Sequence, residues 1–411
     1  MIKRLIEKIK ELGLKGLIEE RIRLWKTKRY EPFIRSYIES HPIEKGTIVF
    51  SSRPDYSDNG KALSEYMRDN GFFSKYKVYW LVEDAERCKK LYPDAGVTFL
   101  TMYDKTGVYN RETLMVYLRM EYVLATHVFY VPKMLSNPKQ SRFLLWHGCG
   151  FKDKGWTKFI PNNFDKVCVS GPLFIKTKMK YWCIDEDRII AKGYPRYDWM
   201  RQKGVASAKM AEELKGGNDK LIIWMPTFRN AVGFKEKGIS SFPLMAKNQD
   251  WNCLDEYCKA NNVMLLVKLH IYQNDYHVDF SRFSNIKRIA NKDFEERGVN
   301  MYEFLPLTDG LISDYSSVAV DYILTDKPIA FALDDFEQYK SLRGFVFDDP
   351  RIYMPGHKLY NLDDLMGFIK DCAEGKDTFK EDREKMLNVA IHQSDNYCQE
   401  IMEALGFSCA S

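Results

Sequence analysis

Large apolar residues recur at steps of three and four positions through the first 25 residues of the chain. Lysine, arginine and glutamate occupy most positions between them. This spacing places the apolar side chains on one face of a helix and the charges on the other. We predict an N-terminal amphipathic helix, which Gly13 and Gly16 weaken or bend. Its apolar positions are Ile2, Leu5, Ile6, Ile9, Leu12, Leu17, Ile18, Ile22 and Trp25.

From about Thr47 onward, short apolar runs alternate with amphipathic stretches such as 61–70 and 84–91. Strands that alternate with helices imply parallel sheets whose two faces are both covered. We therefore expect an α/β chain with two doubly wound, Rossmann-like domains and a cleft between them. The predicted strands are 46–52, 77–82, 122–126, 143–146 and 166–170, followed by 221–225, 263–269, 310–314 and 328–332.

A polar stretch that ends in Gly216-Gly217-Asn218 separates the two series of strands. We therefore predict a basic helical segment at 1–45 and a first Rossmann-like domain at 46–200. The polar stretch itself, 201–220, is predicted as a linker. Residues 221–411 are predicted as a second Rossmann-like domain with C-terminal helices.

The charge of the chain is unevenly distributed. The 411 residues include 62 basic and 57 acidic ones, and ten of the basic and four of the acidic residues lie within residues 1–30. The remainder is therefore close to neutral, which does not favour nucleic-acid binding because that function needs a basic face. Hydrophobic residues make up 45% of the chain, which excludes a disordered protein.

The nine cysteines are scattered, their number is odd, and no Cys-x-x-Cys pair occurs. This pattern predicts reduced thiols in a cytosolic protein rather than disulfides or a zinc site. Charges interrupt the N-terminus, so it does not read as a secretory signal. No run of 18 apolar residues predicts a membrane span.

Two roles are open for the basic helix at residues 1–30. The helix could pack on the protein's own core. It could also lie on an anionic membrane surface, where Trp25 suits the interface and each basic residue contributes about 1 kcal/mol. We expect in the second case that the net positive charge holds the protein at the membrane reversibly.

Polar residues follow four of the predicted strands. The carboxyl ends of parallel strands face the ligand in doubly wound domains, so we expect these residues to line one cleft. The glycines after one histidine let a ligand approach the backbone, and a Ser-Ser pair at a helix start offers hydroxyls and N–H groups to an anion. The candidates are His147 and Gly148, Thr227 and Arg229, Lys268 and His270, and Asp314, Ser316 and Ser317.

Each candidate taken alone could be structural. A histidine can be a hydrogen-bonded core residue, Asp314 and Ser316 can cap a helix, and Arg229 can belong to an ion pair. We prefer the structural role for the other histidines, His127, His277, His357 and His392. At successive strand ends, however, the candidates together favour binding of a phosphorylated donor between two domains.

Several sequence motifs occur in a specific order. They are Leu145–Lys152, Lys192–Asp198, Trp224–Arg229, Val267–His270, Ile312–Asp321 and Asp334–Tyr339, with further matches at Tyr56–Asn59, Arg343–Asp348 and Pro355-Gly356. Over about residues 45–390, the chain resembles the CDP-glycerol glycerophosphotransferase family, the teichoic-acid primases and polymerases. The resemblance implies a GT-B-type fold with an acceptor-side first domain and a nucleotide donor-side second domain. It also implies transfer of glycerol phosphate from CDP-glycerol to a polymer hydroxyl at the inner face of the bacterial membrane.

Three positions depart from the family pattern. Cys149-Gly150 stands where Thr-Pro is common, Asn230 where Asp is usual, and Ile271 where proline is common. Both histidines, His147 and His270, are kept. The departures therefore leave the transfer chemistry in place and bear on which polyol phosphate is transferred and to which acceptor.

The reaction implied by the resemblance is attack of an acceptor hydroxyl on the phosphorus that bears the glycerol, with CMP as leaving group. His147 is expected to act as the base, because a neutral imidazole accepts the hydroxyl proton. Cations and donors must stabilise the pyrophosphate charge. The catalytic candidates are His147 and His270, and the substrate-binding candidates are Arg229, Thr227, Lys268, Asp314, Ser316, Ser317, Gly148 and Asp321.

No cofactor or metal is expected, because Asp314 and Asp321 alone do not make a carboxylate cluster. The expected partners are CDP-glycerol or CDP-ribitol, a lipid-linked glycan or polyol-phosphate acceptor, and an anionic membrane surface that residues 1–30 contact. The expected location is the cytoplasmic face of the cell membrane, as a peripheral protein. The short region before the first strand favours a primase or a short capsule-type transferase over a polymerase.

Two other classes of protein remain open from the sequence. A GT-B nucleotide-sugar glycosyltransferase would use similar groups at its strand ends. A non-catalytic lipid- or polymer-binding protein would keep the fold without the chemistry, although His147, His270 and Arg229 argue against it.

Overall fold

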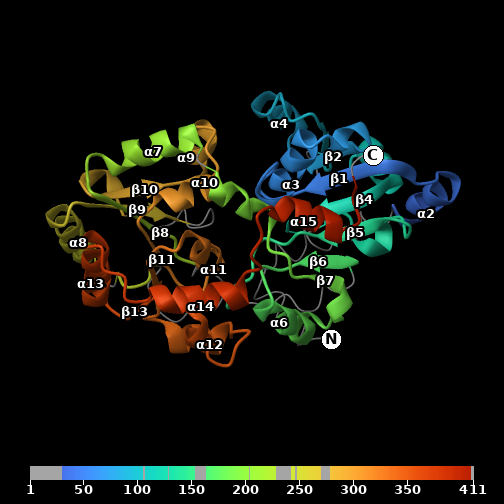
Figure 1. Cartoon of the computed structure of the whole chain (residues 1–411). Helices are drawn as coiled ribbons and strands as arrows, with labels where there is room; N and C mark the ends of the chain where they lie inside the picture. Colours follow the sequence, from blue (N-terminus) through green and yellow to red (C-terminus); the bar gives the residue numbers. More distant parts are fainter. Residues whose placement is uncertain are drawn as a thin grey trace, which may run out of the picture.

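Two parallel sheets form two lobes of the molecule (Figure 1). This arrangement confirms the predicted α/β class with two Rossmann-like domains. The computed structural model describes residues 30–104, 107–127, 129–152, 163–202, 204–227, 242–245, 248–269 and 278–408. The predicted amphipathic helix, whose last apolar position is Trp25, therefore lies outside the described residues. Within the described part, no helix has the length and apolar character needed to cross a membrane.

The first lobe contains a seven-stranded sheet in the order β3-β2-β1-β4-β5-β6-β7. Its strands are β1 (Glu44–Ser51), β2 (Lys77–Val82), β3 (Thr98–Thr101), β4 (Met120–Ala125), β5 (Ser141–Leu144), β6 (Lys166–Cys168) and β7 (Ile189–Ile190). The helices of this lobe are α2 (Glu31–Ser40), α3 (Asp58–Asp69), α4 (Ala85–Leu91), α5 (Arg111–Arg119) and α6 (Leu173–Trp182).

The second lobe contains a six-stranded sheet in the order β10-β9-β8-β11-β12-β13. Its strands are β8 (Lys220–Trp224), β9 (Val263–Lys268), β10 (Ile286–Ile289), β11 (Gly310–Ser313), β12 (Ile329–Ala332) and β13 (His357–Leu359). The helices that follow in the chain are α7 (Val205–Lys215), α8 (Asn248–Ala260), α9 (Asn291–Glu296), α10 (Met301–Phe304), α11 (Val318–Tyr322), α12 (Phe336–Leu342), α13 (Leu362–Ala373), α14 (Lys380–Ala390) and α15 (Tyr397–Ala404).

The central strands are continuous apolar runs because helices cover both faces of each sheet. In β9, every residue of 263–267 is buried, and in β1 all residues from Thr47 onward are buried. All nine predicted strands overlap a strand of the structure, and α3 and α4 confirm the two predicted helices.

The predicted linker at 201–220 is largely a helix. Met210 and Ala211 of α7 are buried, and the helix packs against β8 and β9 of the second lobe. The helix ends at Gly216, whose φ of +61° is the left-handed conformation that glycine adopts without strain. The polar composition of this stretch reflects the solvent-facing side of a surface helix that packs on the second lobe.

The last helix does not belong to the second lobe, although the sequence predicts it there. The helix α15 packs against α3 and the 3₁₀ turn Pro195–Tyr197 of the first lobe (Figure 1). The carboxylate of Asp198 accepts hydrogen bonds from the backbone N–H groups of Tyr397 and Cys398, both at 2.8 Å. Beyond the helix, Phe407 contacts the rings of Tyr76 and Tyr122. The C-terminal segment therefore crosses from the second lobe back to the first.

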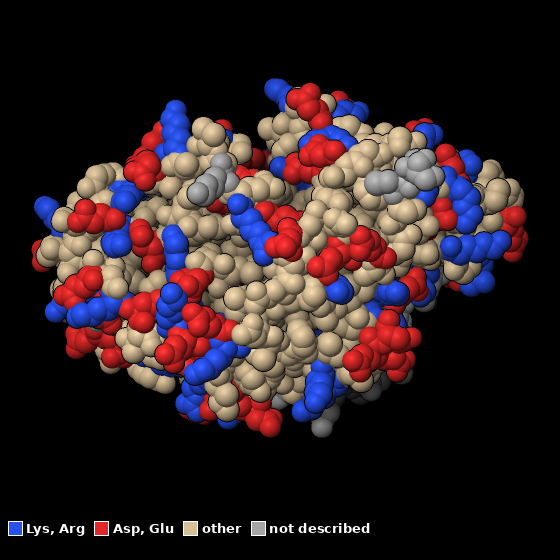
Figure 2. Space-filling model, in the orientation of Figure 1, with Lys and Arg blue, Asp and Glu red and all other residues tan. Residues whose placement is uncertain are grey.

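Charges of both signs are mixed over the face of the molecule shown in Figure 2. This face carries no extended basic patch, which agrees with the nearly neutral composition of the chain beyond residue 30. Between the lobe that carries α7 and α9 and the lobe that carries α4, the surface is hollowed. The two lobes thus meet along only part of their facing sides.

Candidate functional site

His147 lies immediately after β5, in a loop that reaches the second lobe. Trp146 has a φ of +58° and Gly148 a φ of +137°, so the backbone bends sharply on both sides of the histidine. A Cβ atom on Gly148 would lie 2.5 Å from Oγ of Ser317, and one on Gly150 would lie 3.0 Å from the backbone nitrogen of Ser317. The glycines thus allow close approach, as the sequence predicts, but the group that fills the space is Ser317 of the second lobe.

The imidazole of His147 stacks on that of His127, with ring centroids 4.6 Å apart and planes at 7°. Nδ1 of His147 is buried and has no hydrogen-bond partner among the described residues. Burial lowers the pKa of His147 well below its ordinary value, and the neighbouring His127 and nearby cations such as Arg196 lower it further. The imidazole is therefore neutral at neutral pH, the form that a general base requires.

His127, for which the sequence favours a structural role, lies against the ring of His147. It follows β4, and its Nδ1 accepts a hydrogen bond of 3.3 Å from the backbone N–H of Arg53. Burial lowers its pKa as well. Like His147, it directly follows a predicted strand, so the rule that made His147 a candidate applies to His127 as well.

The backbone of the His147 loop is held by two side chains of the first lobe. The Nδ2 atom of Asn59 donates to the carbonyl of Trp146 at 2.6 Å, and Nη1 of Arg196 donates to the carbonyl of His147 at 3.0 Å. Both Asn59 and Arg196 are fully buried. These contacts fix the direction in which the histidine leaves the end of the strand.

Arg196 also joins the two lobes. Its Nη1 lies 2.6 Å from Oδ1 of Asp58, and its Nη2 lies 2.6 Å from Oδ2 of Asp321 on α11. Burial opposes the charge of Arg196, but Asp321 and Asp58 outweigh this effect and raise its pKa. The sequence reasoning had no role for Arg196, which lies in a 3₁₀ turn rather than at the end of a strand.

Asp321 occupies a different environment from the one expected of a substrate-binding residue. It is fully buried, and its carboxylate also accepts hydrogen bonds from the hydroxyls of Tyr197 at 2.5 Å and Tyr302 at 3.1 Å. The side chain therefore connects protein groups of both lobes. In this arrangement Asp321 is a positioning residue at the junction of the lobes.

A second group of predicted residues meets where β8 and β11 end. The carboxylate of Asp314 is fully buried and accepts hydrogen bonds from the backbone N–H of Thr227 at 2.7 Å and from that of Ser316 at 3.2 Å. The hydroxyl of Thr227 also donates to Asp314 and accepts from Nζ of Lys152 at 3.1 Å. Asp314 thus orders both loops, and Lys152 of the first lobe reaches them.

Ser316 and Ser317 precede a helix that is only five residues long. A helix this short has a weak dipole, so the anion-binding capacity predicted for this point rests on hydroxyls and backbone N–H groups. Both serines are only partly buried. Ser317 is in contact with Gly148 and so lies next to the His147 loop.

Two of the predicted residues, Arg229 and His270, lie outside the described residues. Their roles therefore stay predictions. Lys268 is the last residue of β9 and is partly buried, and burial lowers its pKa to about 8. Among the described residues, no three His, Cys, Asp or Glu side chains are grouped so that they could hold a metal ion.

The two lobes, each built on a parallel sheet, have the two-domain arrangement of the GT-B type. Residues 34–404 match the family model described as CDP-Glycerol:Poly(glycerophosphate) glycerophosphotransferase. This chain belongs to that family, as the motifs in its sequence predict.

Known proteins that resemble the chain carry related names. It is 24% identical over 396 residues to the teichoic acid poly(glycerol phosphate) polymerase of Bacillus spizizenii, covering 87% of this chain and 86% of that protein. It is 26% identical to the teichoic acid ribitol-phosphate polymerase TarL of Staphylococcus aureus, covering 79% of this chain and 56% of that protein. The fold resembles that of the wall teichoic acid polymerase TagF, with a TM-score of 0.68, 21% identity and 94% and 96% of the two chains covered.

Proposed function

We propose that this chain transfers glycerol phosphate, or a related polyol phosphate, from a CDP-activated donor to a hydroxyl of a lipid-linked or polymeric acceptor, with release of CMP. The position of His147 carries this proposal. Its imidazole is neutral, its loop is held by Arg196 and Asn59, and Gly148 of the same loop lies next to Ser317 of the opposite lobe. Family membership supplies the class of donor.

In the proposed reaction, a lone pair of the acceptor hydroxyl attacks the phosphorus that bears the glycerol. The bond between this phosphorus and the oxygen of CMP breaks, and CMP leaves with the electron pair. His147 takes the proton of the attacking hydroxyl, and such a base contributes roughly 10²–10⁴-fold to the rate. Because burial keeps the imidazole neutral, it can accept this proton at neutral pH.

The charge of the pyrophosphate requires donors and cations on the second lobe. We assign this role to the hydroxyls of Ser316 and Ser317, of which Ser317 borders the His147 loop. We also assign Arg229, His270 and Lys268 to the stabilisation of the pyrophosphate charge, because of their places in the sequence. The buried carboxylate of Asp314 supports the site indirectly, because it holds the serine loop and Thr227 in place.

The names of the relatives guide our proposal for the donor and the acceptor. One relative is named for poly(glycerol phosphate) and another for ribitol phosphate, so the donor is CDP-glycerol or CDP-ribitol. The acceptor is a lipid-linked glycan or a polyol-phosphate chain in teichoic-acid or capsule-type polymer synthesis. Residues 1–30 are proposed to hold the protein at the anionic cytoplasmic face of the membrane, which would bring it to such an acceptor.

The test is a donor screen with purified protein, using CDP-glycerol, CDP-ribitol and a UDP-sugar, with lipid-linked and oligomeric acceptors. We expect acceptor-dependent release of CMP and a mass increase of one polyol phosphate. His147→Ala should lower this rate by roughly 10²–10⁴-fold, whereas His41→Ala, a histidine at the end of α2, should not. Release of UDP would identify a nucleotide-sugar glycosyltransferase instead, and full turnover by His147→Ala would remove the histidine from the base role.

A further inference from the structure

The ring of His147 lacks the hydrogen bond that commonly orients a histidine base. In such bases a carboxylate or a carbonyl holds the ring nitrogen that does not face the substrate, and this bond fixes the tautomer and the orientation. Nδ1 of His147 is buried and has no hydrogen-bond partner among the described residues. Asn59 and Arg196 bind backbone carbonyls of the loop, which does not restrict rotation about the side-chain bonds of the histidine. The orientation of the ring must therefore come from packing.

Two aromatic rings pack against the imidazole of His147. The ring of Trp146 has its centroid 4.0 Å away and is tilted by 45°. The ring of His127 has its centroid 4.6 Å away and is parallel to within 7°. Trp146 is the neighbour of His147 in the chain, so its contact follows from the local bend of the backbone. His127 comes from a different strand, and its face-to-face contact restricts rotation of the imidazole about its own side-chain bonds.

His127 is itself held at one ring nitrogen. Its Nδ1 accepts a hydrogen bond of 3.3 Å from the backbone N–H of Arg53. A ring nitrogen that accepts a hydrogen bond carries no proton, so the neutral ring has its proton on Nε2. Burial lowers the pKa of His127, which favours this neutral form. His127 therefore presents an uncharged ring of fixed orientation to the proposed base.

The two histidines leave the first sheet at its topological switch point. The strand order β3-β2-β1-β4-β5-β6-β7 places β1 beside β4, so successive strands are added in opposite directions on the two sides of this pair. In doubly wound sheets, ligands bind beyond the carboxyl ends of the strands at such a point. Arg53 follows β1, His127 follows β4 and His147 follows β5. Both histidines are partly exposed, so the ring pair lies where a ligand of the first lobe is expected.

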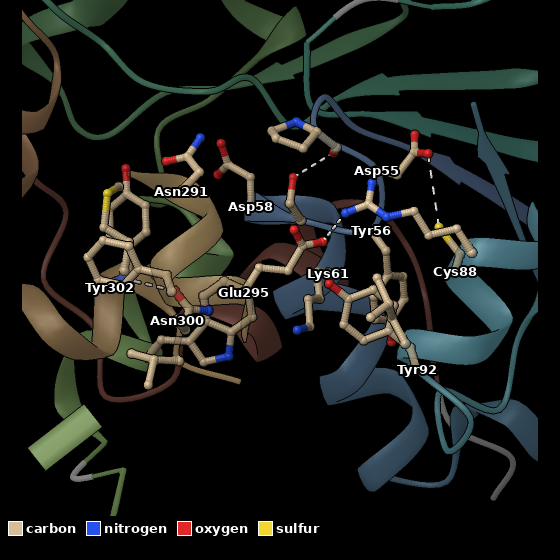
Figure 3. A pocket seen from close by; sticks show the side chains of 18 residues that line it. Asp55, Tyr56, Asp58, Lys61, Cys88, Tyr92, Asn291, Glu295, Asn300 and Tyr302 are labelled. Carbon is tan, nitrogen blue, oxygen red and sulfur yellow. Dashed lines mark hydrogen bonds and ion pairs between the residues drawn. The ribbon is translucent and has the colours of Figure 1, made fainter. Parts of the chain in front are cut away.

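The groups around the two rings favour the neutral form of both. Burial lowers the pKa of His147 most, and the neighbouring His127 is the next cause. Asp58 opposes the effect of burial on His127, but this carboxylate pairs with Arg196 at 2.6 Å, on the wall of a cavity of about 410 Å³ between the lobes (Figure 3). A proton on His127 would break its hydrogen bond with Arg53 and place a charge against the base. Cations also act on both rings: Arg196, Lys178 and Lys152 on His147, and Arg196 and Arg53 on His127.

We infer that His127 is a positioning residue for His147: its ring, anchored to the backbone after β1, fixes the plane in which the proposed base meets the acceptor hydroxyl. The inference rests on the proposed function, because it concerns the base of that reaction. The proton of the hydroxyl moves to His147, and His127 stays neutral with its own proton on Nε2. His127 acts through the base and needs no contact with the donor.

The test compares two variants of His127 in the full-length protein. His127→Asn keeps an oxygen near the position of Nδ1 that can accept from Arg53, but it removes the ring. His127→Phe keeps a ring and removes the acceptor. We expect kcat for acceptor-dependent CMP release to fall roughly 10–100-fold in His127→Asn, because the base is misplaced, and to fall less in His127→Phe. The KM for the CDP-activated donor should stay as in the wild type, since His127 does not contact the donor.

A second measurement does not depend on turnover. The pKa of His147 is followed by NMR in protein labelled at the histidine ring carbons, with its signal assigned by its loss in His147→Gln. Both variants of His127 should raise this pKa, because they remove the neighbouring ring that lowers it. His357→Asn is the matched control. His357 is a partly buried histidine on β13 that packs against Phe368 and Phe379, and its replacement should change neither kcat nor the pKa of His147.

Three results would each overturn the inference: wild-type kcat in His127→Asn, a loss in His127→Phe as large as that in His127→Asn, or an unchanged pKa of His147 in both variants. The proposed function fails separately. Absence of CMP release by the wild-type protein with every donor and acceptor would reject the proposed function, whatever the NMR titration shows. CMP release by the wild type that His127→Asn leaves unchanged would reject the role of His127 alone.

Discussion

Arg196 and Asp321 form a fully buried ion pair, with Nη2 and Oδ2 2.6 Å apart, where the two lobes meet. Asp58 on the first lobe shares the same guanidinium, and the third contact of Arg196 is the carbonyl of His147. One side chain therefore takes part both in the contact between the lobes and in holding the loop of the proposed base. The five predictions below concern this arrangement and the elements attached to it.

Removing the guanidinium should destabilise the protein strongly. Arg196→Leu leaves the buried carboxylate of Asp321 without its cation, and loss of one partner from a buried pair costs about 3–5 kcal/mol. We expect a corresponding fall in the unfolding midpoint in urea. Arg35→Leu is the control, because its pair with Glu31 is exposed and should contribute about 1 kcal/mol or less. Equal effects of the two substitutions would contradict the role given to Arg196.

The activity should hold at mildly acidic pH. Burial lowers the pKa of His147, and a base acts when it is deprotonated, so the acidic limb of kcat/KM shifts to lower pH. We expect kcat/KM to stay level from about pH 8 to about pH 6.5 and to fall only below that. A limb with a midpoint at or above about 6.5 would be inconsistent with a buried neutral base.

The same shift has a consequence for stability. In the unfolded chain His147 gains a proton near about pH 6.5, whereas in the folded chain it does so only at lower pH. The free energy of unfolding is therefore retained above about pH 6.5 and decreases as the pH falls from there toward the folded-state pKa. His147→Gln should show a smaller decrease in Tm between neutral pH and about pH 5.5 than the wild type does.

A methyl group at Gly148 should separate the two lobes locally. A Cβ there would lie 2.5 Å from Oγ of Ser317, and the φ of +137° is unfavourable for alanine. We expect Gly148→Ala to lower the transfer rate by about a hundredfold, the effect of misplacing a catalytic group by about 1 Å. Gly367→Ala is the control, since that glycine lies exposed within α13 with open space around it and should stabilise the helix by about 0.5–1 kcal/mol. A fully active Gly148→Ala enzyme would show that the contact with Ser317 is dispensable.

The helix α15 should detach from the first lobe when Asp198, whose carboxylate caps the start of this helix, is replaced. Asp198 accepts hydrogen bonds from two backbone N–H groups at the start of α15, and bonds to a charged acceptor contribute about 1.5–3 kcal/mol each. Asp198→Ala should lower Tm and expose residues after 390 to limited proteolysis. Asp395→Ala, at an exposed position nearby, should do neither. If cleavage were equally fast in both variants, the attachment of α15 to the first lobe would not depend on Asp198.

The strands that the sequence pattern missed share one property. They are β3, β7, β10 and β13, and each lies at an edge of its sheet. They have at most four residues, and polar side chains such as Lys287, Arg288 and Lys358 interrupt them. An edge strand has a neighbour on one side only and needs no continuous apolar run, so its pattern is weak.

The residues around His147 also include some that a sequence rule can find and others that it cannot. The rule that ligands lie at the carboxyl ends of parallel strands predicted His147, Gly148, Thr227 and Asp314 as site residues. It could not identify Arg196, whose partners Asp58 and Asp321 are 138 and 125 positions away in the chain. It also could not separate residues that face a ligand from residues that hold loops, as Asp314 does.

The sequence by itself determined the alternation of strands and helices, the inner strands of both sheets, the family and the histidine loop, because periodic burial and strand ends leave a local pattern. The tertiary structure decided where the sheets end, which lobe α15 joins, and which polar side chains connect the lobes. Those features depend on contacts between residues far apart in the chain. A buried arginine or a capping aspartate carries no local pattern that distinguishes it from a residue on the surface.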